Sequence, residues 1–88
     1  MPSTKIYLST AGRPLDPDDA RVPVLDRGFL FGDGVFETLR TAGGRPVLWR
    51  PHLDRLRRSA AGIGLPIPWS DAELRAAADV THRATGNP

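Results

Sequence analysis

Cysteine is absent from this chain of 88 residues. Its absence excludes a disulfide, an iron–sulfur cluster and a cysteine-ligated zinc site. Small secreted domains commonly carry disulfides, so the missing cysteines favour the cytoplasm. Long hydrophobic runs are also missing: no stretch approaches a membrane span, and the first residues lack the apolar core of a signal peptide. We therefore expect a cytoplasmic protein with no membrane partner.

Lysine is nearly absent as well. Lys5 is the only lysine, and the other eleven basic residues are arginines, in a chain of net charge +2. A nucleic-acid-binding surface would cluster basic residues and interleave them with aromatics. The densest basic run, Arg50–Arg58, is instead a helix candidate that contains Asp54. We expect solvated arginines and no nucleic-acid partner.

Polar and apolar residues alternate over three short segments, which predicts strands. Val35–Thr41 and Pro46–Trp49 flank a glycine-containing turn at 42–45 and should form a hairpin. The other segments are a strand at Lys5–Thr10, a turn at 11–14 and a short extended piece at Val22–Leu25.

Two helices follow. Pro51 suits the first position of a helix, and an apolar stripe continues from it until Gly62 and Gly64, through Leu53, Leu56, Ala60 and Ile63. Ser70 and Glu73 form a capping box that opens the second helix. Its buried side is expected to contain Leu74, Ala77, Ala78 and Thr81. The predicted fold class is α+β, a small, mostly antiparallel sheet packed on helices. Such a sheet leaves one face or edge poorly covered.

The segment from Asp26 to Gly34 has three glycines in seven residues, which predicts a sharply bent turn. The glycines lack dinucleotide-fingerprint spacing, and no lysine with Ser or Thr follows, so the segment is not a phosphate-binding loop of either common kind. Asp26 and Asp33 are predicted to cap local backbone groups.

Glu37 lies on the same face of the predicted strand as Val35 and Leu39, opposite Phe36, Thr38 and Arg40. A carboxylate on a half-buried face needs a partner. Arg27 or Arg40 could supply it, and a structural ion pair is favoured over an acid pair. The chain shows no spacing of ligands for a metal site, and His52 and His82 are far apart.

In the first helix, His52, Arg55 and Ser59 form a polar stripe beside the apolar one. Arg55 could hold an anion there, or it could pair with a carboxylate; the spacing leaves both open. Arg57 and Arg58 are expected in solvent, with Arg58 paired to Asp54 four residues earlier.

The chain contains two linked motifs, Asp-Arg-Gly-Phe-Leu-Phe-Gly-Asp-Gly-Val-Phe-Glu-Thr-Leu-Arg at 26–40 and His-Leu-Asp-Arg-Leu at 52–56. They resemble motifs of the class IV pyridoxal-phosphate enzymes, the family of branched-chain and D-amino-acid aminotransferases and aminodeoxychorismate lyase. The resemblance implies the small N-terminal domain of a two-domain, usually homodimeric enzyme that binds pyridoxal phosphate between its domains. It assigns the cofactor phosphate to Arg55, and it makes Phe36, Thr38 and Arg40 substrate-pocket candidates.

The resemblance has limits that become expectations. D-amino-acid aminotransferases carry tyrosine where this chain has Phe36, which argues against that subgroup and favours a lyase or a generic transaminase. The lysine that holds the cofactor in this family falls beyond residue 88, so residues 1–88 are expected to be an incomplete small domain that is inactive alone. The alternative is a freestanding, non-catalytic module that binds an anion or a protein.

Overall fold

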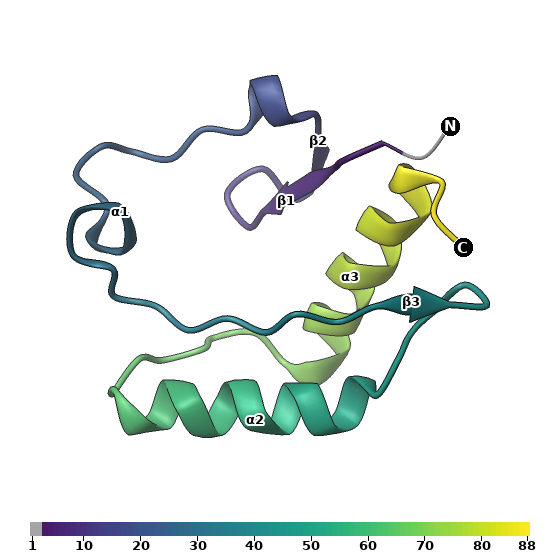
Figure 1. Ribbon diagram of the computed structural model, residues 1–88. Coiled ribbons are helices and arrows are strands. Elements are labelled where there is room, and N and C mark those ends of the chain that lie inside the picture. Colours follow the sequence, from purple (N-terminus) through teal and green to yellow (C-terminus); the bar gives the residue numbers. More distant parts are fainter. Residues whose placement is uncertain (1–2) are drawn as a thin grey trace. The chain divides into compact units, whose positions relative to one another are not determined.

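The computed structural model describes residues 3–88, which form two compact units (Figure 1). One unit combines the chain up to Arg21 with residues 41–45 and the segment from Trp69 onward. The other combines residues 22–40 and 46–68. The two units contain the strands and helices of an α+β fold, as the sequence predicts.

The first unit opens with an antiparallel hairpin of β1 (Ile6–Leu8) and β2 (Arg13–Leu15). The chain reverses at residues 9–12, where Gly12 has φ +69°, a conformation that glycine adopts without steric cost. The observed strand β1 is therefore shorter at both ends than the predicted strand, Lys5–Thr10. The turn predicted at 11–14 is displaced, because residues 13 and 14 already pair with β1.

Helix α3 (Asp71–Thr85) packs against this hairpin, and Figure 1 shows its last turn beside the described segment that leads into β1. The backbone N–H of Ser3 donates to the carbonyl of Thr85 at 2.8 Å. The predicted capping box is present: the Glu73 N–H donates to the Ser70 hydroxyl, and the Ser70 N–H donates to the Glu73 carboxylate. The predicted inner side of α3 is half-buried.

In the second unit, α2 (Trp49–Gly62) begins two residues before the predicted Pro51. Leu53 and Ala60 of the apolar stripe are buried and Leu56 is half-buried. The prediction was wrong for Ile63, which is exposed because the helix has already ended at Gly62 and turned the side chain off the stripe.

Before α2, the local structure differs most from the sequence prediction. The glycine-rich segment contains a short helix, α1 (Arg27–Phe31), which begins with the Asp26 carboxylate accepting from the Gly28 N–H and ends at Gly32 with φ +67°. The predicted hairpin is reduced to β3 (Thr41–Ala42) and β4 (Arg45–Pro46). Residues 34–40 form no strand, because a ladder needs a neighbouring strand and the described residues provide none there.

The buried hydrophobic residues of the part that the structure describes are Leu15, Leu53 and Ala60. Large apolar side chains are exposed along residues 22–36 in particular. Among residues 3–88, no helix combines the length and apolar character needed to cross a membrane.

Candidate functional site

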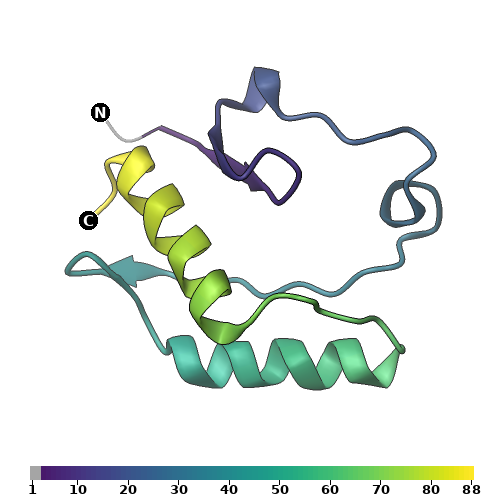
Figure 2. The same cartoon turned by 180° about the vertical axis from the view of Figure 1, so that it is seen from behind.

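The second unit contains a compact polar cluster that joins the segment before β3 to helix α2. From the helix, Arg55 donates through Nε to Oε2 of Glu37 at 2.9 Å and through Nη2 to Oε1 at 2.7 Å. Figure 2 shows residues 34–40 running as an extended segment alongside α2. The two parallel bonds make this a bidentate pair, the strong and directional form of an arginine–carboxylate contact.

His52 completes the cluster. Its Nδ1 lies 2.6 Å from Oε1 of Glu37, so a proton on Nδ1 joins the ring to the carboxylate. His52 and Arg55 are three residues apart on α2 and therefore lie on one side of the helix. Only 10% of the Glu37 side chain is exposed. The carboxylate is thus held by two side chains from consecutive turns of one helix.

The charge state of Glu37 follows from these contacts. Its pKa is lowered from 4.5 to about 2, chiefly by the hydrogen bond from Arg55 and then by that from His52, while burial opposes the change. The pKa of Arg55 is raised by its hydrogen bond and charge interaction with Glu37. The pair is therefore fully ionised at neutral pH.

Arg55 retains donors that this pair does not use. Glu37 takes the Nε–Nη2 edge of the guanidinium, and 60% of the Arg55 side chain is exposed. A guanidinium has five N–H donors in a planar fork. The Nη1–Nη2 edge can therefore meet a carboxylate or a phosphate in a second bidentate contact without breaking the first.

The structure resolves two alternatives that spacing left open. Arg55 does pair with a carboxylate, and its partner is Glu37. The expectation that Arg27 or Arg40 would neutralise Glu37 was wrong, since Arg27 instead bonds Asp33 at 2.8 Å. The short α1 helix and the turn at Gly32 bring together the two members of that second pair, which are six residues apart.

The three pocket candidates, Phe36, Thr38 and Arg40, are exposed, and they alternate with half-buried Val35, Glu37 and Leu39. The alternation agrees with the predicted division into two faces. It does not test the pocket role, which stays a prediction. Among the neighbouring arginines, Arg57 is half-buried rather than solvated, and Asp54 pairs with Arg50 at 3.3 Å, not with the predicted Arg58.

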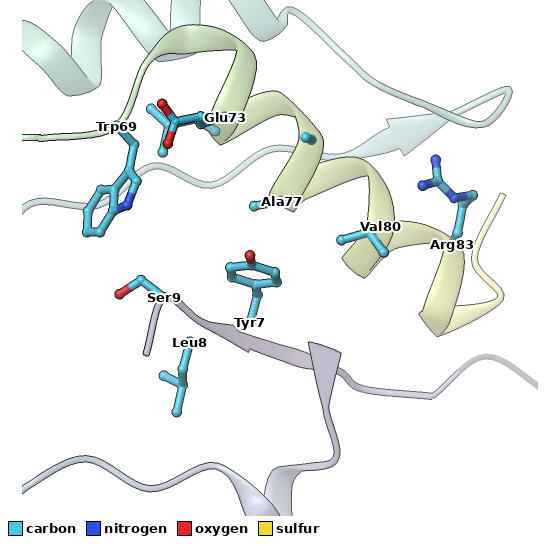
Figure 3. A pocket seen from close by; sticks show the side chains of 10 residues that line it. Tyr7, Leu8, Ser9, Trp69, Glu73, Ala77, Val80 and Arg83 are labelled. Atoms are coloured by element: carbon cyan, nitrogen blue, oxygen red, sulfur yellow. The ribbon is translucent and has the colours of Figure 1, made fainter. Parts of the chain in front are cut away.

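The first unit contains a groove that the sequence reasoning missed. It lies between β1 and α3, has a volume of about 860 Å³ and is lined mainly by apolar side chains. Figure 3 shows Tyr7 pointing from β1 toward Ala77, with Val80 and Trp69 along the same wall. The only signal was that Tyr7 lies on the opposite face of its strand from Ile6 and Leu8.

The second unit thus combines a bidentate Glu37–Arg55 pair with guanidinium donors that the pair does not use. Comparison with known proteins shows the family to which the chain belongs. The sequence profile of the family described as amino-transferase class IV matches residues 34–87, which include the whole Glu37–His52–Arg55 cluster. The chain therefore belongs to the class IV aminotransferase family, as its two motifs indicated.

Similar proteins have aminotransferase names. The chain is 48% identical over 62 residues to a D-alanine aminotransferase of Listeria monocytogenes serotype 4b, covering 70% of this chain and 22% of that protein. It is 37% identical over 71 residues to a D-alanine aminotransferase of Staphylococcus epidermidis, covering 81% and 24%. A protein provisionally named a branched-chain-amino-acid aminotransferase in Methanocaldococcus jannaschii is 43% identical over 70 residues, covering 80% and 24%. The chain spans less than a quarter of the length of these relatives.

Proposed function

We propose that this chain is the N-terminal portion of a pyridoxal-phosphate-dependent aminotransferase, in which Arg55 binds the phosphate of the cofactor. The observation that carries the proposal is the exposed Nη1–Nη2 edge of Arg55, an arginine that Glu37 fixes in place. Among the described residues, this edge has only a 3.4 Å contact from Nη2 to Nδ1 of His52. The family assignment and the aminotransferase names of the similar proteins support it.

The donor set fits the group. A phosphate is tetrahedral and can present two of its oxygens to the planar guanidinium fork, so arginine binds it with two parallel N–H bonds. Arg55 has such an edge available while Glu37 keeps its own pair. When bound, pyridoxal phosphate supplies the electron sink for chemistry at an amino acid's α-carbon. The residues of this chain hold its phosphate and line the site.

The substrate side of the proposal concerns Phe36, Thr38 and Arg40. Their exposed face offers an aromatic wall, a hydroxyl and a guanidinium, which suit an amino acid or keto acid with its carboxylate. The similar proteins act, by name, on D-alanine or branched-chain amino acids. The argument from Phe36 against the D-amino-acid subgroup stays a prediction, and so does the aminodeoxychorismate-lyase alternative. We further propose a homodimer for the intact enzyme, as is usual in the family.

The test is a cofactor titration of the full-length protein that contains this chain. A charge-assisted bond to phosphate is worth about 1.5–3 kcal/mol, so Arg55→Ala should raise the cofactor Kd roughly ten- to a hundredfold. Arg55→Lys should recover only part of the affinity, because lysine lacks the bidentate fork.

The matched control is Arg58→Ala, on an exposed residue of the same helix. It should stay within about 0.5 kcal/mol of wild type, as an exposed charge does. Wild-type affinity in Arg55→Ala, or an equal loss in Arg58→Ala, contradicts the proposed placement of the phosphate. A full-length protein that binds inorganic phosphate but no pyridoxal phosphate would favour the non-catalytic module.

A further inference from the structure

We infer that Glu37 is a positioning residue for the phosphate-binding arginine: it holds one edge of the Arg55 guanidinium so that the other edge is presented to the anion. This inference rests on the proposed function and deepens it. The observation behind it is that the two edges of one guanidinium have different surroundings. The Nε–Nη2 edge is taken by the carboxylate. On the Nη1–Nη2 edge, the described residues place only a 3.4 Å contact between Nη2 and Nδ1 of His52, whose proton faces Glu37.

The geometry fixes the plane of the guanidinium. One hydrogen bond would let the group rotate, whereas two parallel bonds of 2.9 and 2.7 Å define its plane and its direction together. Arginine has a long stem and loses considerable rotamer freedom when it binds a ligand. A stem already held at Glu37 has lost much of that freedom before the anion arrives, so less is lost on binding.

Glu37 can act as a fixed point because it is itself held. Its side chain is 90% covered, and His52 bonds the same Oε1 that receives the Arg55 Nη2 donor. Among the residues that the structure describes, the two side chains on Glu37 both come from α2. The helix therefore sets the position of the carboxylate, and the carboxylate sets the direction of Arg55.

A negative charge beside an anion site also has an opposing effect. The carboxylate repels a phosphate and cancels part of the charge of Arg55. Two features favour positioning over repulsion. The phosphate would lie on the neighbouring edge of the guanidinium, which shares Nη2 with the Glu37 edge but faces another direction. The Arg55 side chain is 60% exposed, so solvent screens the repulsion. Solvent screening does not reduce the benefit of holding the Arg55 side chain in one conformation before the anion binds.

The experiment compares two probes on the full-length protein: pyridoxal 5'-phosphate and pyridoxal, which lacks the phosphate. Glu37→Gln keeps the shape and one acceptor but removes the charge. It should raise the Kd for pyridoxal phosphate roughly three- to tenfold and leave the Kd for pyridoxal unchanged. Glu37→Asp, which retains the charge on a shorter stem, should lie between Glu37→Gln and wild type. Far-UV circular dichroism checks that each variant keeps its fold.

A double-mutant cycle with Arg55→Ala completes the test, because positioning acts only through Arg55. In the Arg55→Ala background, Glu37→Gln should have no further effect on either probe. An equal loss for both probes would show a merely structural role for Glu37. Unchanged or tighter binding of pyridoxal phosphate in Glu37→Gln would overturn the inference, and so would a loss that persists without Arg55.

The two proposals can fail separately. If Arg55→Ala weakens pyridoxal phosphate binding while Glu37→Gln does not, the phosphate role stands and the positioning role is wrong. If Arg55→Ala leaves the affinity unchanged, the proposed function of Arg55 is wrong and the inference falls with it.

Discussion

The fold alters the ionisation of Glu37, and this gives a pH dependence with a definite sign. Its pKa falls from 4.5 to about 2 because Arg55 and His52 stabilise the charged form. A lowered pKa means that the folded state binds this proton less well than the unfolded state. The stabilisation is therefore complete above about pH 4.5 and is lost progressively as the pH falls toward 2.

Carboxyl-detected NMR of the full-length protein should find this transition. The side-chain carbon of Glu37 is expected to titrate near pH 2 in the wild type. In Arg55→Ala the largest cause of the shift is gone, so the midpoint should rise toward 4.5. A wild-type midpoint near 4.5 would show that the bidentate pair does not persist in solution.

At this scale the sequence predicted each residue better than it predicted the pair. The alternation around Glu37 indicated a half-buried carboxylate in need of a partner, and the helical stripe of His52, Arg55 and Ser59 indicated a polar flank. Joining the two required the path of the chain between residues 37 and 55, which spacing does not determine. The nearer arginines, Arg27 and Arg40, were the wrong choice because the short α1 helix directs Arg27 to Asp33.

Among the elements, α3 depends on a cap whose contribution can be measured. Ser70→Ala removes the hydroxyl that accepts from the Glu73 N–H. It should cost about 0.5–2 kcal/mol of stability in the full-length protein, measured by urea unfolding. Ser59→Ala, at an exposed position within α2, is the control and should cost nothing, because alanine is the better helix former. Equal free energies of unfolding for the two variants would mean that the capping box does not stabilise α3.

The helices were predicted more accurately than the strands, and the reason is physical. Caps, prolines and glycines that bound α2 and α3 lie within or next to the helices themselves, and helical hydrogen bonds are local. A strand depends on a partner that can be far away in sequence. Residues 34–40 have the alternation of a strand, but within the described chain only β3 and β4 pair nearby. These residues therefore have an exposed side and a half-buried side, as a strand would, but no hydrogen-bonded β-ladder.

For the molecule as a whole, the balance between buried and exposed apolar residues decides stability. The described residues bury three hydrophobic side chains, while Val24, Leu25 and Phe36 are among the large apolar ones left in solvent, Phe36 with 85% exposure. Burial of apolar surface is the main favourable term in folding, and typical domains reach about 5–15 kcal/mol. We expect the isolated chain of residues 1–88 to be only marginally stable.

Urea unfolding and sedimentation of the isolated 88-residue chain will test this expectation. The unfolding transition should be shallow or absent, or the chain should self-associate through its exposed apolar residues. A monodisperse monomer with several kcal/mol of stability would contradict it. That result would also favour a freestanding module over a portion of a larger enzyme.

The bond between Glu37 and Arg55 also constrains how this sequence can change over time. A substitution at either position leaves the other charge without its partner. The cost is greatest when Arg55 is replaced, because the Glu37 carboxylate is largely buried. Reversing the charge at position 37 or 55 alone would place two like charges together. Exchanging the two residues, with arginine at 37 and glutamate at 55, would restore the pair but remove the guanidinium from α2. We therefore expect substitutions at these two positions, eighteen residues apart, to be coupled to each other and to His52.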